Sequence, residues 1–168
     1  YKIIGVGDFQ DYLSPKENSL SKIEVLTPLL SEDLLQKNDL LFVRSNGNKA
    51  LIGRCLYICD EFKSPTSFSG FTIRARIHSV QKVQPLFLAY FFRTRLAKDQ
   101  ISIFGGGTNI SNLSQAILAG IKIPFPPLPE QIKIAQILST WDKAITQTQQ
   151  LIEAKQRLKQ GLMHQLLS

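Results

Sequence analysis

A proline-rich segment followed by a long proline-free one constrains the fold of this 168-residue chain more than any other feature. Residues 123–131 contain four prolines, which hold the backbone extended and cannot donate to a sheet ladder. Pro129 suits the first helical position, where its missing N–H costs no hydrogen bond, and Glu130 complements the positive end of a helix dipole. No proline follows. The sequence therefore predicts two parts, a compact domain over residues 1–128 and one long helix over residues 129–168.

The predicted long helix carries an apolar stripe. Steps of three, four and seven residues separate most of its large apolar side chains, as in coiled coils. At a rise of about 1.5 Å per residue, residues 130–168 span about 58 Å, more than the core of the domain needs. Because an exposed apolar stripe of this length would promote aggregation, we expect it to be buried against a partner helix. The alternative is that the helix folds back on its own domain. The expected interface residues are Ile134, Leu138, Trp141, Ile145, Ile152, Leu158 and Leu162.

Composition limits the class of protein. A hydrophobic content of 43% and a charged content of 20% are typical of one globular domain with an appendage. No apolar run approaches the roughly 20 residues that cross a bilayer, so no membrane partner is expected. The two cysteines, Cys55 and Cys59, have no histidine nearby, and a zinc site needs about four ligands. We expect two buried, reduced thiols, no metal site and a cytoplasmic location.

Positive charge is concentrated in the middle of the chain, although the whole chain has a net charge of +7. Residues 44–98 hold ten basic and two acidic side chains, a net charge of +8, whereas residues 1–43 have a net charge of −3. Such a concentration is the electrostatic footprint expected of a protein that binds a phosphate backbone. The alternative is a surface charge that only keeps the protein soluble.

The domain itself is predicted to be a mixed fold with several strands. Phe71 to His78 is the clearest strand, because apolar residues at odd positions alternate with Thr72, Arg74, Arg76 and His78. Asn-Gly within the turn 45–48 predicts a hairpin between strands 39–44 and 50–59. Further expected elements are strands 2–6 and 22–26, a loop 60–70 and a helix 84–98 with an apolar stripe.

Polar side chains that suit DNA gather in the predicted hairpin turn. Arginine pairs with guanine, asparagine with adenine, and lysine and serine suit phosphates. The turn holds all four types within six residues, the loop after it adds a lysine and hydroxyl groups, and two arginines share one face of strand 71–78. The alternative for each is a solvated surface side chain. The predicted DNA-binding residues are Arg44, Ser45, Asn46, Asn48, Lys49, Lys63, Arg74 and Arg76.

No segment carries a convincing catalytic motif. Phe125 to Leu128 resembles the Asn/Asp-Pro-Pro-aromatic loop of amino-methyltransferases but lacks both the amine-accepting residue and the aromatic one. Gly105 to Gly107 has neither dinucleotide nor P-loop spacing. Glu61-Phe62-Lys63 has the Glu-x-Lys spacing of half a metal-dependent nuclease site, a three-residue match that is common by coincidence. His78 and His164 are far apart in the sequence, and no nucleophile-elbow motif is present. We therefore expect no catalytic residues.

The proline-rich junction and its flanks resemble the specificity subunits of type I restriction-modification enzymes. The most specific part is Pro-Pro-Leu-x-Glu-Gln at the start of a helix, residues 126–131. Residues 38–42 and 50–57 are more weakly similar to the target recognition domain of the family. The other matching positions are Gly105 to Ser111, Leu118, Ile121 to Pro124, Ile134, Leu138, Asp142, Leu151, Lys155, Leu158 and Leu162, so the resemblance covers about a third of the chain.

The resemblance implies a non-catalytic subunit that recognises double-stranded DNA. It implies an α+β fold: a mixed, largely β-sheet target recognition domain with short helices, then a long spacer helix in an antiparallel coiled coil. The implied partners are methyltransferase and restriction subunits and a second copy, or second half, of the specificity subunit. S-adenosylmethionine, Mg²⁺ and ATP are then expected only in partner subunits, and this chain needs no cofactor.

This chain departs from the family pattern by carrying one domain-and-helix unit where a whole family member has two. It also begins with Tyr1 rather than methionine, which suggests a fragment or a half-length subunit trimmed at its N-terminus. Two further hypotheses stay open: a coiled-coil adaptor that does not bind DNA, and a fragment of a stand-alone DNA methyltransferase or nuclease.

Overall fold

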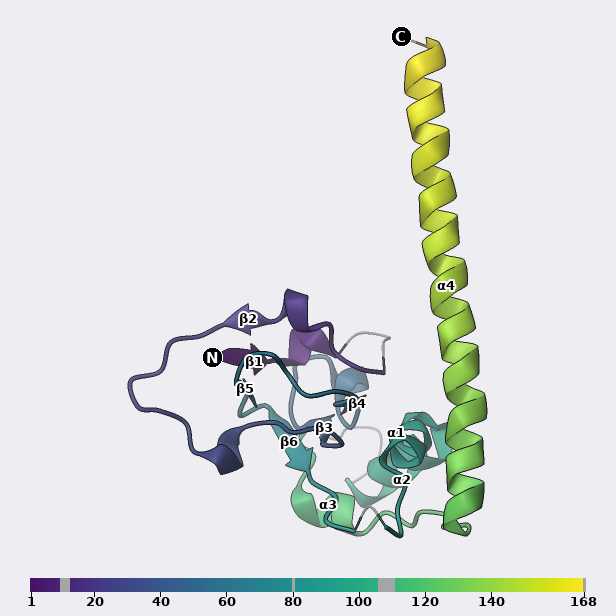
Figure 1. Cartoon of the computed structure of the whole chain (residues 1–168). Helices are drawn as coiled ribbons and strands as arrows, with labels where there is room; N and C mark the ends of the chain where they lie inside the picture. The colour runs from purple at the N-terminus through teal and green to yellow at the C-terminus, as the bar shows by residue number, and fades with distance from the viewer. Residues whose placement is uncertain (10–12, 80, 106–110, 168) are drawn as a thin grey trace.

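The structure, a computed structural model, describes residues 1–9, 13–79, 81–105 and 111–167. Figure 1 shows a small mixed domain beside one end of a long helix, α4 (Leu128–Leu167), which extends far beyond the domain. The strands are β1 (Lys2–Ile4), β2 (Ser21–Lys22), β3 (Leu40–Val43), β4 (Cys55–Tyr57), β5 (Thr66–Phe68) and β6 (Thr72–Ala75). The other α-helices are α1 (Pro85–Arg93), α2 (Arg95–Phe104) and α3 (Gln115–Ala119). The predicted α+β class with a long C-terminal helix is confirmed.

The strands form two small sheets. In one, β1 lies between β2, which is antiparallel to it, and β5, which is parallel, with Lys2 opposite Thr66. In the other, β3 lies between β4 and β6, and both neighbours are antiparallel to it. The expected loop over residues 60–70 is therefore wrong in part, because Thr66–Phe68 pairs with β1.

Strand β3 separates two hydrophobic cores, which is why all four of its residues are buried. Leu40 and Phe42 belong to the core that contains α1 and α2, whereas Leu41 and Val43 belong to a second core with Ile4. The sequence of a strand that is buried on both faces is a continuous apolar run rather than an alternation of apolar and polar residues.

The predicted hairpin is present between β3 and β4, with a longer connection than an Asn-Gly turn. A short 3₁₀ helix, Lys49–Leu51, follows the turn. Gly53 then returns the chain to β4 with a φ of +80°, and a Cβ atom there would lie 2.9 Å from Cδ1 of Ile101. This position therefore requires glycine for its backbone conformation and for space.

Two local predictions are corrected by the packing. Residues 84–98 form parts of two helices rather than one, because the chain breaks at Thr94, whose hydroxyl accepts from the N–H of Ala97 and caps α2. In β6, Thr72 is buried and the side chain of Phe71 is 64% exposed, so the predicted alternation is inverted at this end of the strand. Further along, Ile73 is buried as predicted.

Helix α4 is buried against the domain at its first turns. Ala135 is buried in the larger core and Ile134 packs against it, and Figure 1 shows α1 lying against this end of α4. From Thr140 to Leu167 every side chain is exposed. Within the described residues the protruding part of the helix is not buried against the domain, although Asp142 near its base accepts a hydrogen bond from the hydroxyl of Tyr90. The helix therefore does not fold back on its domain.

Candidate nucleic-acid interface

Three segments that are distant in sequence meet where β3 ends. The backbone N–H of Arg44 donates to the carbonyl oxygen of Phe71 at 2.8 Å, and the carbonyl of Arg44 accepts from the N–H of Leu113 at 2.8 Å. The Arg44 side chain is exposed, and its Nε donates to Oδ1 of Asn112 at 3.3 Å. These contacts fix the hairpin turn between the start of β6 and the segment that leads into α3.

The asparagines of the hairpin turn shape its backbone. Oδ1 of Asn46 accepts from the N–H of Asn48 at 2.7 Å, and Oδ1 of Asn48 accepts from the N–H of Ala50 at 3.1 Å. Such side chain-to-backbone bonds are the reason asparagine is common in turns. Ser45 is half-buried and Lys49 is exposed.

Two open depressions lie around this meeting point. One has a volume of about 580 Å³ and is lined by residues that include Arg44, Arg74, Asn112 and Gln115. The other has a volume of about 530 Å³ and is lined by Ser45, Asn46, Gly47 and Phe71 among others. None of the described residues that line either depression is acidic. We call the two together the hairpin surface, and its charged groups are guanidiniums only.

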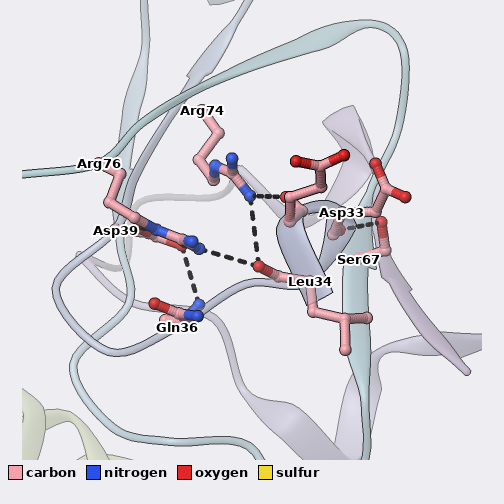
Figure 2. Close-up of polar contacts among 8 residues, drawn as sticks. Asp33, Leu34, Gln36, Asp39, Ser67, Arg74 and Arg76 are labelled. Carbon is pink, nitrogen blue, oxygen red and sulfur yellow. Dashed lines mark hydrogen bonds and ion pairs between the residues drawn. The ribbon is translucent and has the colours of Figure 1, made fainter. Parts of the chain in front are cut away.

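Arg74 in β6 and Arg76, one residue after that strand, lie on the same side, as predicted, and both face the segment before β3 (Figure 2). Arg76 makes a two-pronged ion pair with Asp39: Nε to Oδ1 and Nη2 to Oδ2, each at 2.8 Å. Its Nη2 also donates to the carbonyl of Leu34 at 2.9 Å. The hydrogen bond to Asp39 raises the pKa of Arg76.

Arg74 binds the same segment through backbone carbonyls. Its Nη1 donates to the carbonyl of Glu32 and, at 3.3 Å, to that of Leu34, and its guanidinium lies over the ring of Phe68 at 5.4 Å. These two arginines therefore hold residues 32–39 against β6. Contact of either with DNA stays a prediction.

Lys63 lies in a different part of the domain. Its backbone N–H donates to both carboxylate oxygens of Glu17, at 3.1 and 3.3 Å, and that carboxylate also pairs with Lys2 at 2.9 Å. The bond from Lys2 is the main reason that the pKa of Glu17 is lowered. The Lys63 side chain is exposed and lines neither depression of the hairpin surface, and the same holds for Asn48 and Lys49.

Sequence reasoning missed three residues of this surface: Phe71, Asn112 and Gln115. The alternating pattern of 71–78 predicted Phe71 to be buried. No local signal connects Asn112 with Arg44, because 68 residues separate them. Gln115 begins α3, and only the fold brings it to the wall of the depression.

The predicted interface residues of α4 divide into two groups. Ile134 packs against the domain of its own chain. The others, Leu138, Trp141, Ile145, Ile152, Leu158 and Leu162, have between 39% and 66% of their surface exposed. A shallow groove of about 380 Å³ among them is lined by Leu151, Ile152, Lys155, Gln156 and Lys159. An apolar stripe this exposed is typical of interaction surfaces, and pairing through it stays a prediction.

The described residues offer little for metal or thiol chemistry. They contain no cluster of three or more histidine, cysteine, aspartate or glutamate side chains that would hold a metal ion. Cys55 is buried, and burial raises the pKa of its thiol, whereas Cys59 is exposed, which corrects the expectation of two buried thiols. Within the described ranges, no helix combines the length and apolarity that crossing a bilayer requires.

The fold and the hairpin surface define a class of protein: a small mixed domain with a basic surface, carried on a protruding helix with an exposed apolar stripe. Residues 1–156 match the family described as the type I restriction modification DNA specificity domain. The chain therefore belongs to this family, as the sequence motifs predicted.

Known specificity subunits are similar to the chain at modest identity. It is 26% identical over 180 residues to the type I restriction enzyme MjaVIII specificity subunit of Methanocaldococcus jannaschii, covering 100% of this chain and 42% of that protein. It is 28% identical over 133 residues to the EcoKI specificity subunit of Escherichia coli K12, covering 77% of this chain and 28% of that protein. The chain thus spans less than half the length of these relatives.

Solved structures support the fold. The crystal structure of the HsdS subunit from Thermoanaerobacter tengcongensis matches with a TM-score of 0.63 at 16% identity, over 97% of this chain and 41% of that one. A chain from a structural study of assembly and conformational transition of the type I restriction-modification system matches with a TM-score of 0.60 at 19% identity, over 95% of this chain and 36% of that one.

Proposed function

We propose that this chain is a DNA-recognition unit of a type I restriction-modification specificity subunit, and that it reads one half of a bipartite DNA site. The observation that carries the proposal is the family match over residues 1–156, because it includes both the domain and most of α4. In this proposal the chain is not an enzyme.

The hairpin surface supports DNA binding by its charge and its chemistry. Its guanidiniums face no lining carboxylate among the described residues, which favours a polyanion. Arg44, Ser45 and Asn46 offer donors and acceptors for bases and phosphates. Asn48, Lys49 and Lys63 extend the contact along the duplex, while Arg74 adds positive charge and, with Arg76, holds residues 32–39 in place.

Helix α4 serves in this proposal as spacer and association element. Its exposed stripe takes an antiparallel helix of a second copy of this chain or of a second half of the subunit, since the relatives are more than twice as long as the chain. If two copies pair about a two-fold axis, the recognised half-sites are inverted repeats. Methyltransferase subunits dock on the paired helices, and the restriction subunit joins through them.

Catalysis and cofactors belong to the partners in this arrangement. S-adenosylmethionine, Mg²⁺ and ATP bind to the methyltransferase and restriction subunits, and the complex works in the cytoplasm with its DNA.

Salt-dependent DNA binding is the central test. The affinity of the chain for duplex DNA is measured by fluorescence anisotropy between about 50 and 200 mM salt, and log K is expected to fall linearly with log salt concentration. Arg44→Glu is expected to weaken binding and lower the slope. The matched control is Arg95→Glu, an arginine on α2 whose side chain is 93% exposed and which lines neither depression, and it is expected to change little.

Each competing hypothesis has its own outcome. A chain that associates with itself but shows no salt-dependent binding to duplex DNA is a coiled-coil adaptor, and the proposal is then wrong. A calorimetric titration that detects S-adenosylmethionine bound to this chain, together with methylation of DNA without partners, supports a methyltransferase fragment instead.

A further inference from the structure

Arg44 is held by hydrogen bonds at its backbone and at Nε, while its side chain is exposed. Its backbone is bound on both sides, by Phe71 and by Leu113, and its Nε donates to Asn112. An arginine that is already oriented loses less conformational entropy when it binds than one on an open helix. With Nε engaged, the two terminal Nη groups form a further pair of donors in one plane. This pair matches the O6 and N7 acceptors of guanine in the major groove.

The hydrogen-bond partner of the Arg44 side chain distinguishes it from Arg74, Arg76 and Arg95. Arg76 is neutralised by the carboxylate of Asp39, and Arg74 donates to two backbone carbonyls. Arg95 pairs with Asp99 at 3.6 Å on the surface of α2. Arg44 instead binds a neutral amide, which orients the guanidinium and leaves its full charge for a ligand.

The surroundings of Arg44 suit a base edge better than a phosphate alone. Asn112 and Gln115 line the same depression, and both carry amides of the kind that pair with bases. Phe71 lines the adjoining depression, where it is exposed rather than packed in a hydrophobic core. An exposed aromatic beside polar readers provides an apolar contact for a thymine methyl group or a base step.

We propose that Arg44 reads a guanine in the recognised half-site, that Asn112 positions its guanidinium for this contact, and that Phe71 packs against the neighbouring base pair. The inference rests on the proposed function and deepens it by naming the side chains that determine specificity. Asn112 is a positioning residue, because it acts through Arg44 rather than on the base.

The test is selection of bound sequences from a library of duplex DNA with a randomised segment, performed with this chain at low ionic strength. The wild-type chain is expected to enrich a motif with at least one strongly preferred guanine. Arg44→Lys keeps the charge but loses the paired donors, so it is expected to reduce the preference for that guanine over the other bases by roughly 5- to 150-fold while binding of the pool is retained. Arg95→Lys is the control and is expected to select the wild-type motif.

The role of Asn112 is tested by the same selection. Asn112→Ala is expected to relax the preference at the same position as Arg44→Lys, whereas Asn112→Asp, which keeps an acceptor for Nε, is expected to keep the preference for guanine while weakening binding of the whole pool, because its carboxylate offsets the charge of Arg44. A general loss of folding does not produce this pairing of loss and retention. Phe71→Ala is expected to weaken the preference at the adjacent position and to leave the guanine selected.

The outcomes separate this inference from the proposed function. A wild-type chain that selects a motif which Arg44→Lys leaves unchanged, or weakens equally at all positions, overturns the reading of guanine by Arg44 and leaves DNA recognition standing. A wild-type chain that selects no sequence and binds no duplex overturns both.

Discussion

The side-chain oxygen of Gln131, on the first turns of α4, accepts a hydrogen bond from the backbone N–H of Gln84 at 3.0 Å. Its amide nitrogen donates to the carbonyls of Pro126, at 2.8 Å, and Lys82, at 3.3 Å. Gln131 is completely buried, and it satisfies backbone groups in the segment just before α1 and in the proline-rich segment. The glutamine of the Pro-Pro-Leu-x-Glu-Gln motif therefore joins the long helix to the domain and has a structural role.

Replacing Gln131 with alanine is expected to destabilise the domain. The change leaves one N–H and two carbonyls in partly buried contacts without the partner that Gln131 provides, and a fully buried group left in this way costs about 1–3 kcal/mol. The free energy of unfolding, measured by urea denaturation, is expected to fall by that amount or more. Gln136→Ala, at an exposed position on the same helix, is the control and is expected to change it little. Equal stability of the two variants would falsify this role for Gln131.

The Asp39–Arg76 pair is expected to support the fold rather than only the binding surface. The Asp39 side chain is almost fully buried, and its Oδ2 also accepts from the N–H of Gln36 at 2.8 Å. Asp39→Ala leaves the Arg76 guanidinium without its carboxylate partner, although its hydrogen bond to the carbonyl of Leu34 is kept. Because that guanidinium is partly exposed, the expected loss of stability lies at or below the lower end of about 3–5 kcal/mol.

The control for this second prediction is Asp99→Ala, which breaks the exposed pair with Arg95. Exposed pairs of this kind contribute about 0–1 kcal/mol, so a small effect is expected. Urea denaturation of both variants makes the comparison. If Asp39→Ala is no more destabilised than the control, the ion pair does not hold residues 32–39 against β6.

The sequence predicted the features that depend on local signals. The prolines and the stripe of α4 are local, and so are the Asn-Gly turn and the alternation that places Arg74 and Arg76 on one side of residues 71–78. It missed features that depend on distant partners. Thr66–Phe68 is a strand because β1 lies beside it, although its Thr-Ser sequence and the preceding Pro65 are typical of a loop.

The same distinction between local signals and distant partners explains which features of the candidate site the sequence predicted. The alternation at 71–78 correctly placed both arginines on one face, but it gave no sign that the carbonyls of Glu32 and Leu34 occupy that face. Phe71 was expected inside because hydrophobicity alone does not separate a core residue from an exposed aromatic at a binding surface. Arg44 is exposed and its role as a DNA-binding residue stays a prediction, while its contact with Asn112 depends on the fold.

A second contact ties α4 to the domain and is expected to respond to alkaline pH. The hydroxyl of Tyr90 on α1 donates to Oδ2 of Asp142 on α4 at 2.8 Å. Burial, and then this bond, raise the pKa of Tyr90. Since the folded-state pKa lies above the unfolded value of about 10, the stabilisation is full below about pH 10 and is lost as pH rises through the folded-state value.

Tyr90→Phe is therefore expected to reduce the loss of stability that the wild-type chain shows in urea denaturation between about pH 8 and pH 11, a range that includes the ordinary tyrosine pKa of about 10. Tyr57 also has a pKa raised mainly by burial, so part of the alkaline loss is expected to remain. Tyr57→Phe is the comparison variant, because it keeps the part of the alkaline loss of stability that comes from Tyr90. An unchanged alkaline loss in Tyr90→Phe contradicts the prediction.

The exposed stripe of α4 is expected to drive self-association. Ile145→Glu and Leu158→Glu each place a carboxylate in the stripe, where pairing with a second helix would bury it without a partner. Sedimentation at micromolar concentration is expected to show an associated wild-type chain and predominantly monomeric variants, with unchanged helix content because both positions are exposed within one chain. Gln150→Glu adds the same charge on the opposite face of the helix and is expected to leave association intact. A wild-type chain that sediments as a monomer, or a Gln150→Glu variant that dissociates equally, contradicts pairing through this stripe.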